Sequence, residues 1–289
     1  MDTDVLAKYL KAGEIASLAI EFGKGIINIG EKYENIAEEI ENFIISKGGY
    51  PAFPVNLSRN DEAAHYTPGY NDDRRVENKD IIKLDLGVHI DGYIADTAIT
   101  IDVGKNHEKL LNASKSALEN VSKNIRPGIS INDIGGIIEK SIMFFNLKPI
   151  YNLTGHQLDK YTLHTGLSFP NYPSGEYEIV KNNMAFAIEP FATDGSGFIK
   201  EGKFGNIMML KNEEEFPEIY EKYKTLPFSV RWIYRDFSNP ENLLEKLKNS
   251  KNVVKFGILI EKRHGLVSQH EHTFVISNDK VYITTLYKR

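Results

Sequence analysis

The feature that most constrains the fold is an apolar stretch at residues 83–96, which reads KLDLGVHIDGYIAD. Its central Asp-Gly pair is a strong signal for a two-residue β-hairpin turn. If this pair forms the turn, Gly87 lies opposite Asp96, and Asp85 lies opposite Ala98. Because side chains alternate along a strand, the leucines of the stretch then face a core, and both aspartates face the other side.

The presence of two aspartates on the same face of the hairpin requires a physical explanation. Asp85 and Asp96 are diagonal neighbours in this register, about 7–8 Å apart at the backbone. Two carboxylates that point into one space repel each other, and one must take a proton unless a cation compensates. The alternative is a solvent-exposed hairpin face, because exposed aspartates are common. The hairpin alone leaves both interpretations open.

Other acids and histidines lie in strand-like or loop segments elsewhere. Glu189 falls within NMAFAIEPF, and Glu271 falls within GLVSQHEHTFVI. His156 and His164 are eight residues apart in LTGHQLDKYTLHTG, an even spacing that suits one face of a single extended strand. His65 lies in NDEAAHYTPGY, a loop-like neighbourhood where catalytic groups are common. Each of these residues alone is more often a partnered core or rim residue than a ligand.

Together, four carboxylates and one imidazole form a candidate metal-binding set: Asp85, Asp96, His156, Glu189 and Glu271. The set is too negative for one divalent ion but suits two ions about 3.5–4 Å apart that share bridging carboxylates. Its oxygen-rich character favours Mn, Fe or Co and also admits Zn or Ni. The sequence therefore predicts two divalent metal ions per chain.

Composition excludes several other classes of protein. The 289 residues are 41% hydrophobic and carry a formal net charge of -5, with no basic run that would bind nucleic acid. The absence of cysteine excludes disulfides and thiolate metal sites and is consistent with a reducing cytoplasm. The N-terminus lacks the basic start and apolar core of a signal peptide, and no apolar run is long enough for a membrane helix. We therefore expect a cytoplasmic protein with no nucleic-acid or membrane partner.

The order of predicted elements indicates an α+β fold, because hairpins and helices occur without regular βαβ alternation. Apolar periodicity predicts helices at 4–28, 32–47, 107–124 and 131–146. Strands are expected at 50–58, 80–90, 93–102, 149–153, 161–168, 184–191, 253–261, 266–277 and 280–286. The acidic segment 212–250 differs from its surroundings and predicts an insertion of two helices.

These residues resemble the type 2 methionine aminopeptidases of the archaeal kind, which are metallopeptidases of the pita-bread fold. The matching segments are PAFPVNLS (51–58), AAHYTPG (63–69), KLDLGVHIDGYIADTA (83–98), GHQLDKYTLHTG (155–166), AIEPFATDGSG (187–197), LPFSVRW (226–232) and SQHEHT (268–273). The resemblance covers nearly the whole chain. It implies one catalytic domain over 1–289 with a curved antiparallel sheet flanked by helices, and a small helical insertion subdomain at 205–252.

The resemblance also implies a role for each candidate ligand. Asp85 would be a bidentate ligand of one ion, and Asp96 and Glu271 would bridge both ions. His156 and Glu189 would complete the shell of the second ion. A hydroxide held between the two ions would attack the scissile carbonyl.

The remaining site residues take their roles from the same resemblance. His65 corresponds to the catalytic histidine near the scissile bond, and His164 to the second histidine, which contacts the substrate. Glu189 would be the proton shuttle, so the implied catalytic residues are His65, His164 and Glu189. The implied substrate-binding residues are Phe53, His65, Leu163, His164 and Leu266.

The function that follows is removal of the initiator methionine from nascent proteins whose second residue is small. The implied partners are N-terminal methionyl peptides, with transient contact to the ribosome, and the implied state is a monomer. One departure from the family pattern is His270, which stands where an apolar or aromatic residue is usual. Strand alternation points His270 away from the face of Glu271, so we expect a supporting or core residue.

Two alternatives remain open within the same fold. X-Pro aminopeptidases and prolidases usually carry a His-Glu pair where this chain has His164-Thr165, together with a large N-terminal domain. Non-catalytic binding modules of the fold have typically lost metal ligands, whereas all five are present here. Both features favour the aminopeptidase.

Overall fold

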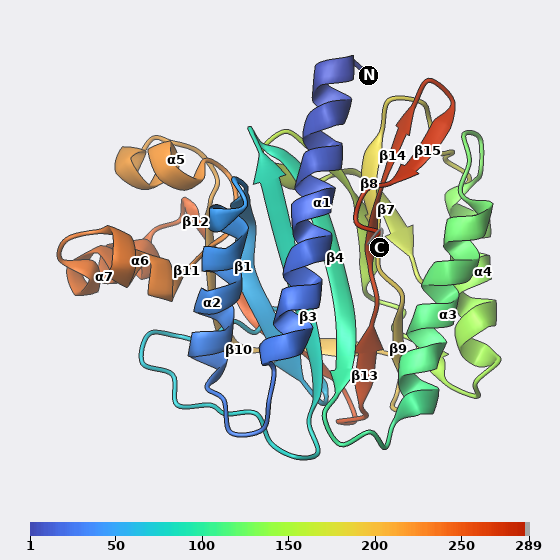
Figure 1. Ribbon diagram of the computed structural model, residues 1–289, viewed down its shortest axis with the longest axis horizontal. Helices are drawn as coiled ribbons and strands as arrows, with labels where there is room; N and C mark the ends of the chain where they lie inside the picture. Colours follow the sequence, from blue (N-terminus) through green and yellow to red (C-terminus); the bar gives the residue numbers. More distant parts are fainter. Residues whose placement is uncertain (287–289) are drawn as a thin grey trace.

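The computed structural model describes residues 1–286 and shows helices packed outside a group of mainly antiparallel sheets (Figure 1). The helices are α1 (Thr3–Ile26), α2 (Tyr33–Ser46), α3 (Glu108–Asn124), α4 (Ile131–Met143), α5 (Pro217–Tyr223), α6 (Val230–Asp236) and α7 (Pro240–Asn249). The strands are β1 (Tyr50–Arg59), β2 (Glu62–Ala64), β3 (Ile81–Ile90), β4 (Tyr93–Asp102), β5 (Lys148–Pro149), β6 (Thr154–Asp159), β7 (Thr162–Pro170), β8 (Ala185–Ile188), β9 (Phe191–Thr193), β10 (Ile199–Leu210), β11 (Phe228–Ser229), β12 (Val253–Glu261), β13 (Val267–Gln269), β14 (His272–Ser277) and β15 (Lys280–Ile283).

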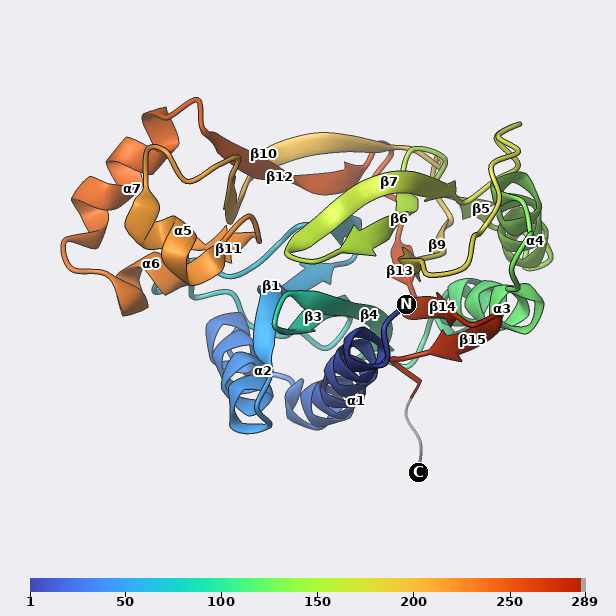
Figure 2. The same ribbon diagram turned by 90° about the horizontal axis from the view of Figure 1, so that it is seen from above.

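The predicted hairpin supplies two strands of the first sheet, whose order is β1-β3-β4. Its register is confirmed, with Gly87 opposite Asp96 and Asp85 opposite Ala98. Leu84 faces the opposite side from the aspartates, as alternation requires, and packs in the apolar cluster beneath α1 and α2. Seen from above, both helices lie on the outer side of this sheet, so the aspartate face points to the interior of the molecule (Figure 2).

The second half of the molecule is built around a sheet with the order β15-β14-β8-β6-β7. Its outer face packs with α3 and α4 in a second apolar cluster that includes Ile138, Phe186 and Phe274. The two halves meet where the Glu271 N–H donates to the Ala98 carbonyl at 2.9 Å. This isolated bridge places β4 beside β14, and the faces that carry the acids therefore come together.

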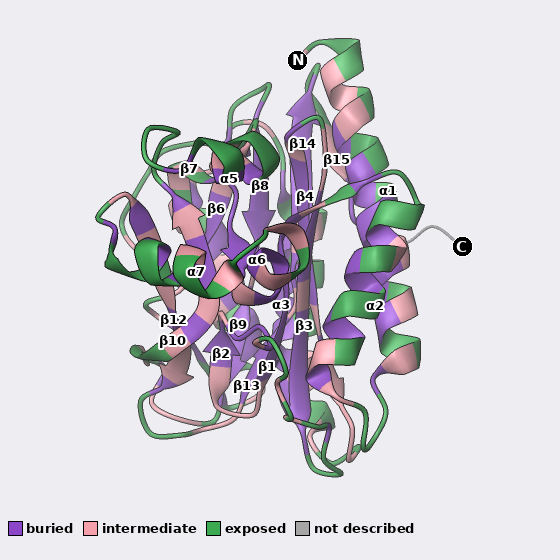
Figure 3. Cartoon of the chain, turned by 90° about the vertical axis from the view of Figure 1, so that its left-hand side faces the viewer, coloured by how far each residue is buried: buried purple, intermediate pink, exposed green. Residues whose placement is uncertain are grey.

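The acidic segment is helical, but it contains three helices where the sequence predicts two. Within residues 212–250, all of which the structure describes, α5, α6 and α7 pack with residues of β10 and β12 in a third apolar cluster that includes Trp232. The helices lie beside the long β10–β12 pair, and α5 and α7 carry exposed residues on their outward faces (Figure 3). The boundaries 205–252 for a separate subdomain stay a prediction.

Several predicted strand boundaries are wrong. His156 and His164 do not share one strand, because a turn at Lys160-Tyr161 separates β6 from the antiparallel β7. The strand expected at 149–153 is reduced to β5, and the strand expected at 266–277 is interrupted before β14. The predicted strand at 184–191 ends at Ile188, which leaves Glu189 in the connection to β9.

The helices of the described part of the chain give no candidate for a membrane span. None of them within residues 1–286 combines the length with the apolar composition that a crossing helix requires. The longest helix is α1, which places its apolar face against the first sheet.

Candidate active site

The five predicted metal ligands converge on one cavity between the two halves of the molecule. Asp85 and Asp96 come from the hairpin, and His156 comes from β6. Glu189 directly follows β8, and Glu271 lies between β13 and β14. Five side chains from distant parts of the sequence therefore line the same space.

Three of these residues form a compact group of potential metal ligands. Asp96, His156 and Glu271 each offer one ligand atom, and these atoms all lie within 4.8 Å of one another. The Nε2 atom of His156 is 3.6 Å from Asp96 Oδ2 and 3.7 Å from Glu189 Oε1. Asp96 and Glu271 are only 3% and 2% exposed, so bulk water does not compensate their charge.

The electrostatics of the group call for a cation. Within residues 1–286, no lysine or arginine nitrogen lies within 4.0 Å of an oxygen of the four carboxylates, and only Asp96 and Glu189 have an ion-pair contact, in both cases with His156. Burial raises the pKa of Asp85 to about 7. Burial, reinforced by the neighbouring carboxylates, also raises the pKa values of Asp96, Glu189 and Glu271 well above their ordinary range.

The donor set fits divalent cations. The buried oxygens Asp85 Oδ1 and Asp96 Oδ1 have no hydrogen-bond partner in the described structure, although buried polar atoms are nearly always satisfied. Divalent ions would satisfy these oxygens and offset the crowded charge. Asp85, Asp96, His156, Glu189 and Glu271 are the residues that could hold them.

Gln269 orients two of the carboxylates and was not predicted as a site residue. Its Nε2 atom donates to Glu189 Oε2 at 3.2 Å and to Glu271 Oε2 at 3.4 Å. Its backbone N–H donates to Thr100 Oγ1 at 2.7 Å, which ties the segment before Glu271 to β4. The signal in the sequence was the even spacing of residues 269 and 271 on one strand face.

The two predicted catalytic histidines both line the cavity. His65 directly follows β2, and its backbone has a φ of 65°. His164 lies on β7, with its ring centroid 4.1 Å from that of His156. Burial lowers the pKa of His65 to about 4, so its imidazole is neutral at pH 7 and can donate one hydrogen bond.

The apolar wall of the cavity agrees only in part with the predicted methionine pocket. Phe53 and Leu163 line the cavity as expected. Ile207, Pro227 and Phe256 also line it and were not predicted. Ile207 and Phe256 belong to β10 and β12, and no local pattern distinguishes them from other apolar strand residues.

Two residues singled out by the sequence lie away from the cavity. Leu266 packs at the edge of the cluster beneath α3 and α4 and is not a lining residue. The Nδ1 atom of His270 is 2.9 Å from Ser114 Oγ of α3, on the far side of the strand from Glu271. His270 is half-buried and points away from Glu271, as strand alternation predicts, and its supporting role stays a prediction.

Comparison with known proteins identifies the family of this chain. The model of the metallopeptidase family M24 matches residues 7–278. The chain belongs to metallopeptidase family M24. A methionine aminopeptidase of Saccharolobus solfataricus is 43% identical over 99% of both chains. A methionine aminopeptidase of Methanocaldococcus jannaschii is 42% identical over 99% of this chain and 100% of its own. The resemblance to the archaeal methionine aminopeptidases is therefore confirmed, and with it the class of metal-dependent peptidase.

Solved structures similar to this M24 chain confirm the α+β pita-bread fold. A thermophilic Arx1 superposes with a TM-score of 0.84 at 17% identity, covering 98% of this chain and 91% of its own. The methionine aminopeptidase of Thermotoga maritima has a TM-score of 0.73 at 19% identity, covering 99% and 98%. The Pyrococcus furiosus prolidase has a TM-score of 0.66 at 16% identity, and the match covers all of this chain but 65% of the prolidase. At these identities the likeness concerns the fold alone.

Proposed function

We propose that this M24 peptidase is a methionine aminopeptidase that removes the initiator methionine from proteins whose second residue is small. The observation that carries the proposal is the convergence of four carboxylates and one histidine in a cavity with an adjoining apolar wall. Similarity to methionine aminopeptidases over the full chain, at about two-fifths identity, supports the same activity.

The metal centre would hold two divalent ions of the group Co, Mn, Fe, Zn or Ni. Asp85, Asp96, His156, Glu189 and Glu271 would hold these ions, with Asp96 and Glu271 as shared ligands, Asp85 on one ion, and His156 and Glu189 on the other. When bound, such ions supply a water with a lowered pKa and polarise the substrate carbonyl.

The protein's own side chains would then handle protons and the developing charge. Glu189, held by Gln269, would take a proton and pass it to the leaving amine. His65 and His164 both line the cavity, and each would donate a hydrogen bond to the oxyanion. A neutral His65 suits this role, because it donates without a charge that would repel the metal ions.

The apolar wall would receive the methionine side chain. Phe53, Leu163, Pro227 and Phe256 lie together in the cavity that the ligands line. A methionine side chain buried against such residues gains about 25 cal/mol for each Å² of apolar surface removed from water. Leu266 stays outside this proposed pocket.

We also propose that the substrates are nascent chains in the cytoplasm, which the lack of cysteine supports. Transient contact with the ribosome and a monomeric state stay predictions from the family resemblance.

A comparison of peptides tests the proposal. Metal-loaded protein should cleave Met-Ala-Ser and should leave Met-Pro and other Xaa-Pro dipeptides essentially intact, while elemental analysis of the same sample reports bound metal. Preferential cleavage of Xaa-Pro dipeptides would favour the prolidase alternative. Bound metal without cleavage of either peptide would favour a non-catalytic module.

A further inference from the structure

The turn that carries His65 is held by a buried ion pair that lies outside the active-site cavity. We propose that Arg231 and Glu41 are positioning residues for His65, and that the helical insertion takes part in catalysis through them. This inference rests on the role of His65 in the proposed function. Neither Arg231 nor Glu41 lines the cavity, so an effect on the reaction has to pass through the residues they hold.

The backbone of His65 needs such support. Its φ of 65° is in the left-handed region, which residues with a Cβ atom enter only at a cost. A conformation of this kind persists only where the surroundings enforce it. Gly205 on β10 comes so close that a Cβ atom there would lie 2.0 Å from the carbonyl oxygen of His65. The turn is therefore both unfavourable by itself and tightly confined.

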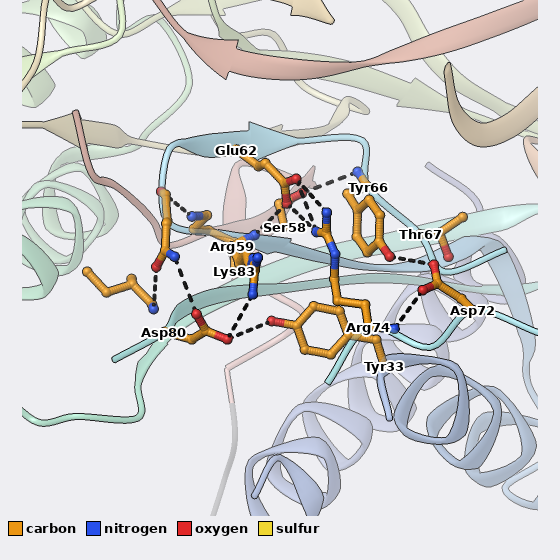
Figure 4. A network of polar contacts seen from close by, with 12 residues as sticks. Tyr33, Ser58, Arg59, Glu62, Tyr66, Thr67, Asp72, Arg74, Asp80 and Lys83 are labelled. Atoms are coloured by element: carbon orange, nitrogen blue, oxygen red, sulfur yellow. Dashed lines mark hydrogen bonds and ion pairs between the residues drawn. The ribbon is translucent and has the colours of Figure 1, made fainter. Parts of the chain in front are cut away.

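One side of the turn is fixed through Tyr66 (Figure 4). The Tyr66 hydroxyl donates to Asp72 Oδ2 at 2.6 Å, and its backbone N–H donates to Ser58 Oγ at 3.3 Å. The Arg74 guanidinium lies 3.8 Å from the centroid of the Tyr66 ring and is paired with Glu62, which precedes the turn on β2. This network holds the chain just after His65 through residues of β1, β2 and the loop that follows the turn.

The other side is fixed by Arg231 of α6. Arg231 Nε donates to the Pro68 carbonyl at 3.1 Å, and Nη2 lies 3.4 Å from Thr67 Oγ1. The Thr67 hydroxyl in turn donates to the Val55 carbonyl of β1 at 2.8 Å. Arg231 is only 3% exposed, so these hydrogen bonds do not compete with bulk water.

Glu41 holds Arg231 in this orientation. Its two carboxylate oxygens accept from Arg231 Nη1 and Nη2, each at 3.0 Å, and the glutamate is fully buried. Glu41 also accepts from the Val55 N–H at 3.2 Å and from Trp232 Nε1 at 2.8 Å. One carboxylate on α2 thus joins the insertion to the strand that carries Phe53.

The geometry depends on the planar guanidinium. Arginine presents several donors in a rigid fork, and here the fork binds a carboxylate on one edge and a backbone carbonyl on another. A lysine at 231 would keep the charge near Glu41 but could not serve both partners in the same plane. Arg231→Lys therefore tests the orientation of the turn without leaving a buried glutamate unpaired.

The test is a double-mutant cycle with Met-Ala-Ser as the substrate. Arg231→Lys should lower kcat about tenfold, because small misplacements of a catalytic group are costly. KM and bound metal should stay at the level of the unmodified protein. In a His65→Ala background the same substitution should lower kcat by no more than about twofold, because residues that act through one another are not additive.

The controls separate positioning from general loosening. Asp236→Asn changes a carboxylate of the same insertion that accepts from Arg235 and Lys222, and kcat should stay unchanged. If Arg231→Lys does not fold, the neutral pair Glu41→Gln with Arg231→Gln takes its place in the cycle. An equal loss of kcat in both backgrounds, or a matching loss in Asp236→Asn, would overturn the inference. A normal kcat for His65→Ala alone would overturn both the role of His65 and this inference. Bound metal without any peptidase activity in the unmodified protein would instead reject the proposed function itself.

Discussion

Glu271 shows how strongly a single residue depends on its surroundings in this protein. It is 2% exposed and accepts a hydrogen bond from Gln269. One of its carboxylate oxygens lies within 4.8 Å of a potential ligand atom of Asp96 and of His156. Burial without a lysine or arginine partner makes its negative charge unfavourable unless a cation is bound. A negative charge at this position is therefore favourable only when metal is bound.

Replacement of this carboxylate by an amide tests the metal centre. Glu271→Gln keeps the shape of the side chain but removes the charge. Substitution of a residue that only hydrogen-bonds to a metal ligand typically lowers the metal affinity about 10–100-fold. Loss of a ligand itself should therefore lower the affinity about 100-fold or more. The amount of bound metal, measured by elemental analysis, and the rate of peptide hydrolysis should fall together. Full hydrolysis by a metal-free variant would contradict the proposed scheme.

His65→Ala should give the complementary result. His65 lines the cavity without belonging to the group of close ligand atoms. Loss of one hydrogen-bond donor to an oxyanion typically lowers kcat about 10²–10³-fold. Metal content should stay close to that of the unmodified protein, and a variant that has lost its metal would show that His65 is a ligand instead.

At the scale of the elements, the pairing of β1 with β3 shapes the proposed methionine pocket. Phe53 is paired with Gly87, and a Cβ atom at Gly87 would lie 2.4 Å from Phe53 Cε1. Alanine at this position would push the Phe53 ring toward the cavity that the ring lines. The glycine therefore sets how much room the substrate side chain has.

Gly87→Ala should raise KM for Met-Ala-Ser about tenfold or more, in line with the effect of one methylene in an apolar pocket. Bound metal serves as the internal check and should change little. Gly136→Ala in α4 is the matched control, because no atom lies within 4 Å of the added Cβ. It should leave KM unchanged and stabilise the fold by about 0.5–1 kcal/mol, as measured by denaturant unfolding. An unchanged KM in Gly87→Ala would show that Phe53 does not form part of the proposed methionine pocket.

The elements also show what local sequence can and cannot reveal. The hairpin register was predictable because the Asp-Gly turn and the alternation of side chains are both local signals. The turn between β6 and β7 was missed because Tyr161 adopts a φ of 54° without the glycine that usually marks such a turn. β10 was missed because its first half is polar and irregularly paired. The cavity residues that β10 and β12 contribute depend on long-range packing, which no local pattern encodes.

The whole molecule should respond to metal removal in a pH-dependent way. Burial raises the pKa of Asp85 from its ordinary value of 3.8 to about 7. Between these values this carboxyl group binds more protons in the folded state than in the unfolded state, so its contribution to the free energy of unfolding falls as the pH rises from about 4 to about 7. Bound divalent ions would take the place of those protons in the folded state.

Histidines such as His65 and His270, whose pKa values are lowered by burial, act in the opposite sense only below their ordinary pKa of 6.5. We therefore expect the melting temperature of chelator-treated protein to fall as the pH rises from about 6.5 to about 8, where the carboxylates dominate. Addition of Co or Mn should raise it most at the upper end of this range, where the carboxylates are otherwise ionised. Thermal unfolding followed by circular dichroism checks both statements. A chelated protein whose melting temperature rises with pH through this range would contradict the electrostatic account of the cavity.

The bridge between Ala98 and Glu271 has a consequence for the synthesis of this protein itself. A chain emerging from the ribosome can form the hairpin with its two aspartates early, but the last carboxylate arrives only when about nine-tenths of the sequence has been made. A growing copy therefore cannot complete the set of carboxylates until synthesis is nearly finished. The metal centre is consequently a late product of folding, assembled only when the two halves of the molecule have closed on each other.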